Sequence, residues 1–165
     1  MNHDPTAVAY PVPDGASVGL LRSNQIPGAV ELFEAQLREH AIDTGTDKIE
    51  SVVRQILADP RLGFILGASV TGKLQGIALC SSFLGVEHGG PSGWLEELYV
   101  HPSCRQLGLG SKLLQAAINE AKKRDWQALE LEVEADHQRV VGLYARHGFQ
   151  PRTRSRFYLK MGSDC

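Results

Sequence analysis

The chain has 165 residues, of which 42% are hydrophobic and 22% are charged, and its formal net charge is -2 at pH 7. This length predicts one domain with its own core, and the slightly negative charge gives no basic surface for nucleic acid. No apolar run is long enough to span a membrane and no basic-then-apolar leader opens the sequence, so we expect a cytoplasmic protein. Cys80, Cys104 and Cys165 are odd in number and far apart, which favours free thiols in a reducing compartment.

The first half of the chain alternates turn-forming residues with helix and strand patterns. Residues 1–16 contain several prolines and little periodicity, so we expect a flexible N-terminal arm followed by a single domain over 17–165. Thr71-Gly72-Lys73 separates two apolar runs and indicates a hairpin. Apolar periodicity predicts, in order, a strand, two helices and two strands, at residues 17–21, 27–39, 47–58, 61–70 and 74–86.

Residues 94–110 combine a strand, a glycine-bearing turn and the start of a helix. Pro102 ends the strand because it has no N–H to give, and Gly108 and Gly110 remove side chains where the backbone must approach something closely. The first N–H groups of a helix have no internal partner, and the helix dipole places positive charge there. The turn is therefore suited to a phosphate or pyrophosphate, with Arg105 as a cation at its mouth. An ordinary helix start, which also uses glycine, is the alternative.

The last third of the chain continues this alternation. A helix from Leu109, a strand at 126–134, a helix at 137–147 and one or two strands at 149–161 are predicted, after a loop at 88–93. The order β-α-α-β-β-β-α-β-α-β(-β) predicts an α/β (α+β mixed sheet) fold with helices on both faces of a mixed central sheet.

Two motifs resemble the GNAT superfamily of N-acetyltransferases. Arg105, Gly108 and Gly110 match its [R/Q]-x-x-G-x-[G/A] acyl-CoA pyrophosphate loop, and residues 143–149 look like its L-Y-x-x-x-G-F signature. The element order matches as well, almost from end to end. The resemblance, to a small single-domain member of bacterial type, implies the GNAT fold and acetyl-CoA as the cosubstrate.

The resemblance also assigns the cofactor contacts. The backbone of residues 98–100 would hold pantetheine and the thioester carbonyl, and the amides of residues 106–111 would hold the pyrophosphate. His137 stands where the family usually has an asparagine, which is a departure. The cofactor-binding candidates are Leu98, Tyr99, Val100, Arg105, Gln106, Leu107, Gly108, Leu109, Gly110, Ser111 and His137.

Three residues are candidates for the chemistry. A free amine is mostly protonated at pH 7, so a base must take its proton before the nitrogen attacks. Glu96 and Glu97 are adjacent, and strand alternation predicts that only one of them faces the cleft unless a bulge intervenes. The spermidine/spermine N-acetyltransferases have a similar L-E-[D/E] strand, and their proposed base matches Glu96, which we favour over Glu97; a water chain is the alternative. The resemblance implies that Tyr144 protonates the departing thiolate. The alternative is that Tyr144 is an aromatic core residue on the apolar face of its helix.

The expected reaction is acetyl transfer to a primary amine by direct attack within a ternary complex, with a small molecule or a peptide as the acceptor. Asp43, Asp47 and Glu87, in the loops at 40–47 and 87–93, favour a cationic acceptor. Protein N-termini or lysines stay open as acceptors, and a non-catalytic acyl-CoA-binding or sensor module is the alternative function. No metal is expected, because no histidine pair has i, i+4 spacing. Homodimers are common in the family, but no residue of this sequence indicates one.

Overall fold

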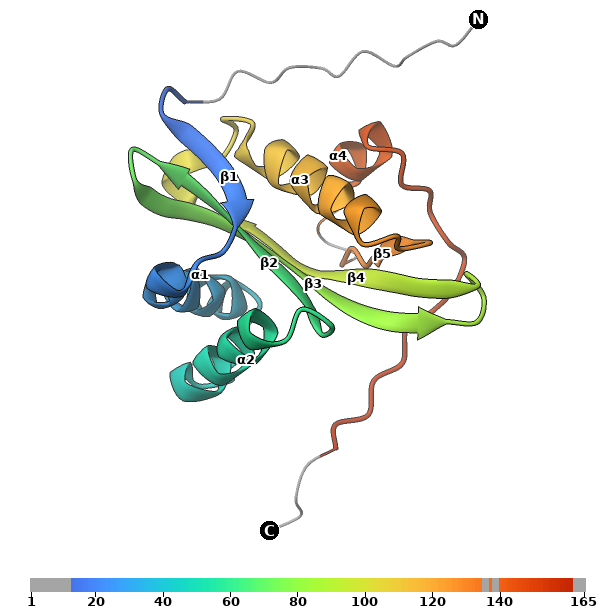
Figure 1. Ribbon diagram of the computed structural model, residues 1–165. Helices are drawn as coiled ribbons and strands as arrows, with labels where there is room; N and C mark the ends of the chain where they lie inside the picture. The colour runs from blue at the N-terminus through green and yellow to red at the C-terminus, as the bar shows by residue number, and fades with distance from the viewer. Residues whose placement is uncertain (1–12, 135–136, 138–139, 162–165) are drawn as a thin grey trace, which may run out of the picture. The chain divides into compact units, whose positions relative to one another are not determined.

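The computed structural model describes residues 13–134, 137 and 140–161 (Figure 1). The chain divides into two compact units, Met1–Glu132 and Val133–Cys165. Among the described residues, the first contains the sheet and three long helices, and the second contains one short α-helix. The single domain expected over 17–165 stays a prediction, and most of the expected N-terminal arm lies outside the described residues.

One mixed sheet organises the first unit. Its strand order is β1-β2-β3-β4-β5, with antiparallel pairing from β1 to β4 and parallel pairing of β5 with β4. The predicted fold class is therefore confirmed. The strands are β1 (Ala16–Leu20), β2 (Gly63–Val70), β3 (Lys73–Gly85), β4 (Gly90–Val100) and β5 (Leu129–Leu131).

Two hairpins build the antiparallel part of the sheet. Val70 pairs with Lys73, and Thr71 and Gly72 between them have φ angles of 47° and 82°. Two successive residues at positive φ give the tight turn that matches the twist of a hairpin, as the sequence predicted. The second hairpin differs from the prediction, because β4 begins at Gly90 inside the expected loop at 88–93. Main-chain pairing with β3 extends the strand there, independently of side-chain pattern.

Helices cover both faces of the sheet. The helices α1 (Ile26–Glu39) and α2 (Thr46–Ala58) lie on one face, and α3 (Leu109–Lys123) lies on the other (Figure 1). The apolar stripe of α1 packs with Ile65, Ile77 and Leu79 of the sheet, whereas α3 buries residues spaced three and four apart. None of the helices in the described ranges has the length and apolar character to cross a bilayer.

The C-terminal region differs most from the sequence prediction. The helix α4 (Val141–Arg146) begins later than the predicted residue 137, and β5 is shorter than the predicted 126–134. The strands predicted at 149–161 are not formed; these residues lie in neither helix nor strand. Phe157 and Met161 are 93% and 88% exposed. Apolar alternation makes a strand only where another strand accepts its hydrogen bonds, and none of the described residues pairs with this segment.

Arg124, at the end of α3, ties this helix to the chain that leads into β2. Its Nε donates to Glu120 at 2.9 Å, and its Nη1 donates to the carbonyls of Pro60 at 2.7 Å and Gly63 at 3.1 Å. The guanidinium also lies 4.8 Å from the centre of the Phe64 ring. A half-buried cation that satisfies three acceptors stabilises the junction of helix and sheet.

We expect Arg124→Met to lower the free energy of unfolding by about 1 to 2 kcal/mol, because two partly buried acceptors lose a charged donor. Urea denaturation measures this change. The control is Arg54→Met, since Arg54 bonds Glu50 at an exposed site on α2 and its loss should cost at most about 0.5 kcal/mol. Equal losses in the two variants would contradict the role given to Arg124.

Candidate functional site

A β-bulge in β4 separates the two candidate glutamates. Leu79 of β3 pairs with Glu97 and Cys80 pairs with Leu95, so Glu96 is an extra residue with no partner in the register. A bulge breaks simple alternation and bends the strand. Glu96 is exposed and Glu97 is half-buried. The simple alternation of a regular strand therefore does not hold at these two residues, and which of them acts as the base stays a prediction.

The bulge also marks the place where β4 loses its outer neighbour. The parallel pairing with β5 covers only Gly93 to Leu95. From residue 98 to residue 100, no strand pairs with the outer edge of β4 in the part of the chain that the structure describes. This segment contains the three residues predicted to hold pantetheine, and main-chain groups on such an edge can bind an extended ligand as an added strand.

A tight turn leads from the end of β4 into α3. Gln106 and Gly108 have φ angles of 63° and 76°, and Gly108 is the N-cap of the helix. The N–H groups of Leu109 and Gly110 fall in the first turn, where helix geometry gives them no internal acceptor. A Cβ atom added to Gly110 would meet only Val100, at 3.9 Å, so packing within the chain does not require glycine there. The open space at Gly110, beside these N–H groups, is therefore suited to a bound ligand that accepts hydrogen bonds.

Arg105 makes contacts that the sequence did not predict. Its Nη2 lies 2.7 Å and 3.0 Å from the two carboxylate oxygens of Glu39, and its Nε donates to the carbonyl of Val100 at 2.9 Å. The Tyr99 hydroxyl donates to the same Glu39 carboxylate at 3.0 Å. Burial acts to raise the pKa of Glu39, but the hydrogen bonds from Arg105 and Tyr99 and the charge of Arg105 outweigh it and lower the pKa. Arg105 thus braces the turn against the end of α1.

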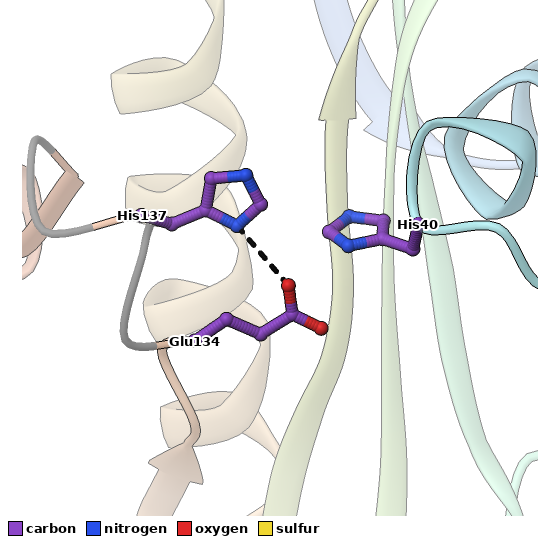
Figure 2. Close-up of side chains that lie close together, drawn as sticks. All are labelled: His40, Glu134 and His137. Carbon is purple, nitrogen blue, oxygen red and sulfur yellow. Dashed lines mark ion pairs between the residues drawn. The ribbon is translucent and has the colours of Figure 1, made fainter.

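The second unit contains Tyr144 and His137. Tyr144 packs edge-to-face on Phe149, with ring centres 5.9 Å apart, and burial raises the pKa of its hydroxyl. The Nδ1 atom of His137 lies 3.4 Å from a carboxylate oxygen of Glu134, an ion pair when the imidazole is protonated (Figure 2). The roles expected for Tyr144 and His137 beside the cofactor stay predictions.

The sequence matches the profile of the Acetyltransferase (GNAT) family over residues 27–149. The chain belongs to the GNAT acetyltransferase family. A mycothiol acetyltransferase of Propionibacterium freudenreichii subsp. shermanii is 26% identical over 140 residues, which cover 84% of this chain and 44% of that protein. An uncharacterised N-acetyltransferase of Methanocaldococcus jannaschii is 33% identical over 67 residues, which cover 41% of this chain and 30% of that protein. The chain thus spans less than half the length of either curated relative.

Solved structures confirm the GNAT fold. An aminoglycoside N-acetyltransferase in complex with CoA superposes with a TM-score of 0.76 at 18% identity, over 89% of this chain and 95% of that one. A ribosomal-protein-alanine N-acetyltransferase from Brucella melitensis biovar Abortus 2308 superposes with a TM-score of 0.72 at 19% identity, over 88% and 99%. At these identities the likeness shows the fold alone.

The sequence analysis did not predict two residues that contact the candidate site. Gln36 donates through its Nε2 to Glu97, and Glu39 holds Arg105. Both lie on α1, more than sixty positions before their partners in the chain. Gln36 could have been noticed as a polar residue on the apolar stripe of α1, whereas nothing in the sequence distinguishes Glu39 from a solvated helix glutamate.

Cys80 is buried beneath the bulge. Burial raises the pKa of its thiol to about 12, and the nearby charge of Glu96 adds to the rise. The thiol therefore stays protonated at neutral pH and cannot act as a nucleophile. The prediction of a free thiol is confirmed for Cys80 and Cys104, whereas Cys165 lies outside the described residues.

The loop between α1 and α2 borders a hollow of about 320 Å³. Glu34, Arg38 and Asp43 lie among its lining residues, so it carries charges of both signs. Its lining comes from α1, α2 and their loop and includes no described residue of β4. The hollow coincides with part of the acceptor boundary expected from the sequence, and its use as an acceptor site stays a prediction.

We expect Glu39→Gln to destabilise the protein by up to about 1 kcal/mol at pH 7, because the pair with Arg105 is partly exposed. The folded-state pKa of Glu39 lies below its ordinary value of 4.5, so the stabilisation is complete above that value and is lost as pH falls through the folded pKa. The unfolding free energies of wild type and variant, measured by urea titration from neutral to acid pH, should converge toward the acid end. The exposed Glu31→Gln on the same helix is the control, and a difference that grows toward acid pH would contradict the assignment.

Proposed function

We propose that the protein transfers an acetyl group from acetyl-CoA to a primary amine by direct attack within a ternary complex. The observation that carries the proposal is the open edge of β4, which runs directly into the glycine turn of α3 within the part of the chain that matches the GNAT family. A strand edge and a helix N-terminus in succession provide for an extended acyl arm followed by a diphosphate.

The residues at the turn fit this cosubstrate. The first amides of α3, with those of Gln106 and Leu107, offer donors to a diphosphate, and Gly110 leaves room for it. Because Glu39 and the Val100 carbonyl engage the Arg105 guanidinium, we propose that Arg105 acts on the diphosphate mainly by shaping the turn.

The proposed chemistry uses three groups of the chain. Acetyl-CoA supplies an acetyl group activated as a thioester. Glu96 takes a proton from the acceptor ammonium, which frees the nitrogen lone pair to form the C–N bond. The amides at the open edge of β4 stabilise the charge on the carbonyl oxygen. As the C–S bond breaks, its electron pair stays on sulfur, and Tyr144 gives its hydroxyl proton to that sulfur. The nitrogen of the new amide loses its second proton to solvent, and the tyrosinate takes a proton from solvent before the next turnover. Burial raises the pKa of Tyr144, which keeps this proton in place at neutral pH.

For the acceptor we propose only a broad class, a primary amine on a small molecule or on a peptide. One fold neighbour is named for aminoglycosides and another for the alanine of a ribosomal protein, so both small amines and peptide N-termini belong in a test. The test measures thiol release from acetyl-CoA with polyamines, aminoglycosides, amino acids and short peptides with an N-terminal alanine.

We expect Glu96→Gln and Tyr144→Phe each to lower kcat/KM at least about tenfold on any amine that the wild type acetylates, because each removes a proton-transfer group. The Kd for acetyl-CoA, measured by calorimetry, should not change. The exposed Glu31→Gln and Tyr158→Phe are matched controls. Tight binding of acetyl-CoA without turnover on any amine would instead indicate a non-catalytic acyl-CoA-binding or sensor module.

A further inference from the structure

Gln36 is a polar residue in an apolar position. It is 7% exposed and is the one buried residue of α1 that carries a polar side chain. Its neighbours on the same stripe, among them Phe33 and Leu32, belong to the core against the sheet. Burying an amide costs about 1 to 3 kcal/mol unless its hydrogen bonds are replaced. A glutamine at this position therefore calls for a partner.

That partner is Glu97. The Nε2 of Gln36 donates to Glu97 Oε2, and the two residues are 61 positions apart. An ionised carboxylate only accepts hydrogen bonds, so the amide must turn its N–H₂ group toward Glu97. The Gln36 Oε1 atom is then buried with no hydrogen-bond partner among the described residues. The amide orientation is set by the carboxylate, at the cost of an acceptor left unsatisfied.

The pair lies beside the proposed reaction site. Glu97 directly follows the bulge, at the start of the β4 segment that β5 does not cover. It is half-buried, on the same face of the sheet as α1, whereas Glu96 is exposed. Two adjacent carboxylates thus differ in environment. One accepts a hydrogen bond from an amide, and the other has no such partner among the described residues.

We propose that Gln36 is a positioning residue that fixes Glu97, and that Glu97 binds a second, non-reacting cationic group of a diamine-like acceptor while Glu96 takes the proton of the reacting amine. This inference rests on the proposed function. A fixed carboxylate suits a permanent ion pair, whereas a proton acceptor must change charge during each turnover. The substrate class is therefore an amine that carries another positive charge a few bonds away.

The test compares putrescine with butylamine, which have the same carbon chain but differ in the second ammonium. We expect the wild type to favour putrescine at least about tenfold in kcat/KM, mainly through KM, since tenfold corresponds to about 1.4 kcal/mol of binding. Glu97→Gln and Gln36→Met should each raise KM for putrescine toward that for butylamine, by a larger factor than any change in kcat.

A double variant separates positioning from general packing. If Gln36 acts through Glu97, Gln36→Met should add nothing for putrescine in the Glu97→Gln background. Gln115→Met, at an exposed glutamine of α3, is the control. If Gln36→Met does not fold, Glu97→Gln alone still tests the preference, because Glu97 is only half-buried.

Three outcomes would overturn the inference. The first is equal wild-type activity on both amines, the second is an equal loss on both amines in the variants, and the third is additive losses in the double variant. These outcomes leave the acetyltransferase proposal standing. If the wild type acetylates no amine of the panel although it binds acetyl-CoA, the proposed function itself fails.

Discussion

The rest of the site depends on one irregularity in β4, the bulge at Glu96. On one side of the bulge, β4 pairs with both β3 and β5; on the other side it keeps only β3 among the described residues. A bulge bends its strand and increases the local twist, and the pairing of β5 with β4 ends at Leu95, directly before the extra residue. An internal sheet strand thus acquires an unpaired edge in its C-terminal half, directly before the turn into α3. Without the bulge, β5 could continue alongside β4 and its main-chain groups would be used within the protein.

The helix α1 is fixed to this irregular strand at two points. Near its end, Glu39 bonds both Arg105 of the turn and Tyr99 of β4. One turn earlier, Gln36 bonds Glu97. The cofactor side and the acceptor side of the proposed site are therefore braced by the same helix. Burying a polar side chain costs more free energy than burying an apolar one, so apolar residues would be enough if α1 only covered the sheet. The polar contacts of Gln36 and Glu39 therefore indicate that α1 also orients side chains of β4 and of the turn.

Local pattern was enough to predict the turn and the elements on either side of it. Three local patterns predicted this region: strand formers before Pro102, glycine at 108 and 110, and the apolar stripe of α3. Each depends only on residues that are close in sequence, and the structure places all three as expected. The bulge could not be predicted, because it depends on how β4 pairs with β3. The contacts of Gln36 and Glu39 join residues sixty or more positions apart. The prediction of strands at 149–161 was wrong because a strand also depends on distant residues. Apolar alternation does not show whether a neighbouring strand is available for pairing.

Hydrogen exchange of the backbone amides, with and without acetyl-CoA, tests the account most directly. The amides of Leu98 and Val100, which do not face β3, and those of the turn at 106–111 are predicted to exchange more slowly when acetyl-CoA is present, because these N–H groups then donate to it. The strand β1, at the far edge of the sheet, should be unchanged. Slower exchange elsewhere with no change at residues 98–100 would contradict the claim that the bulge opens β4 for the cosubstrate.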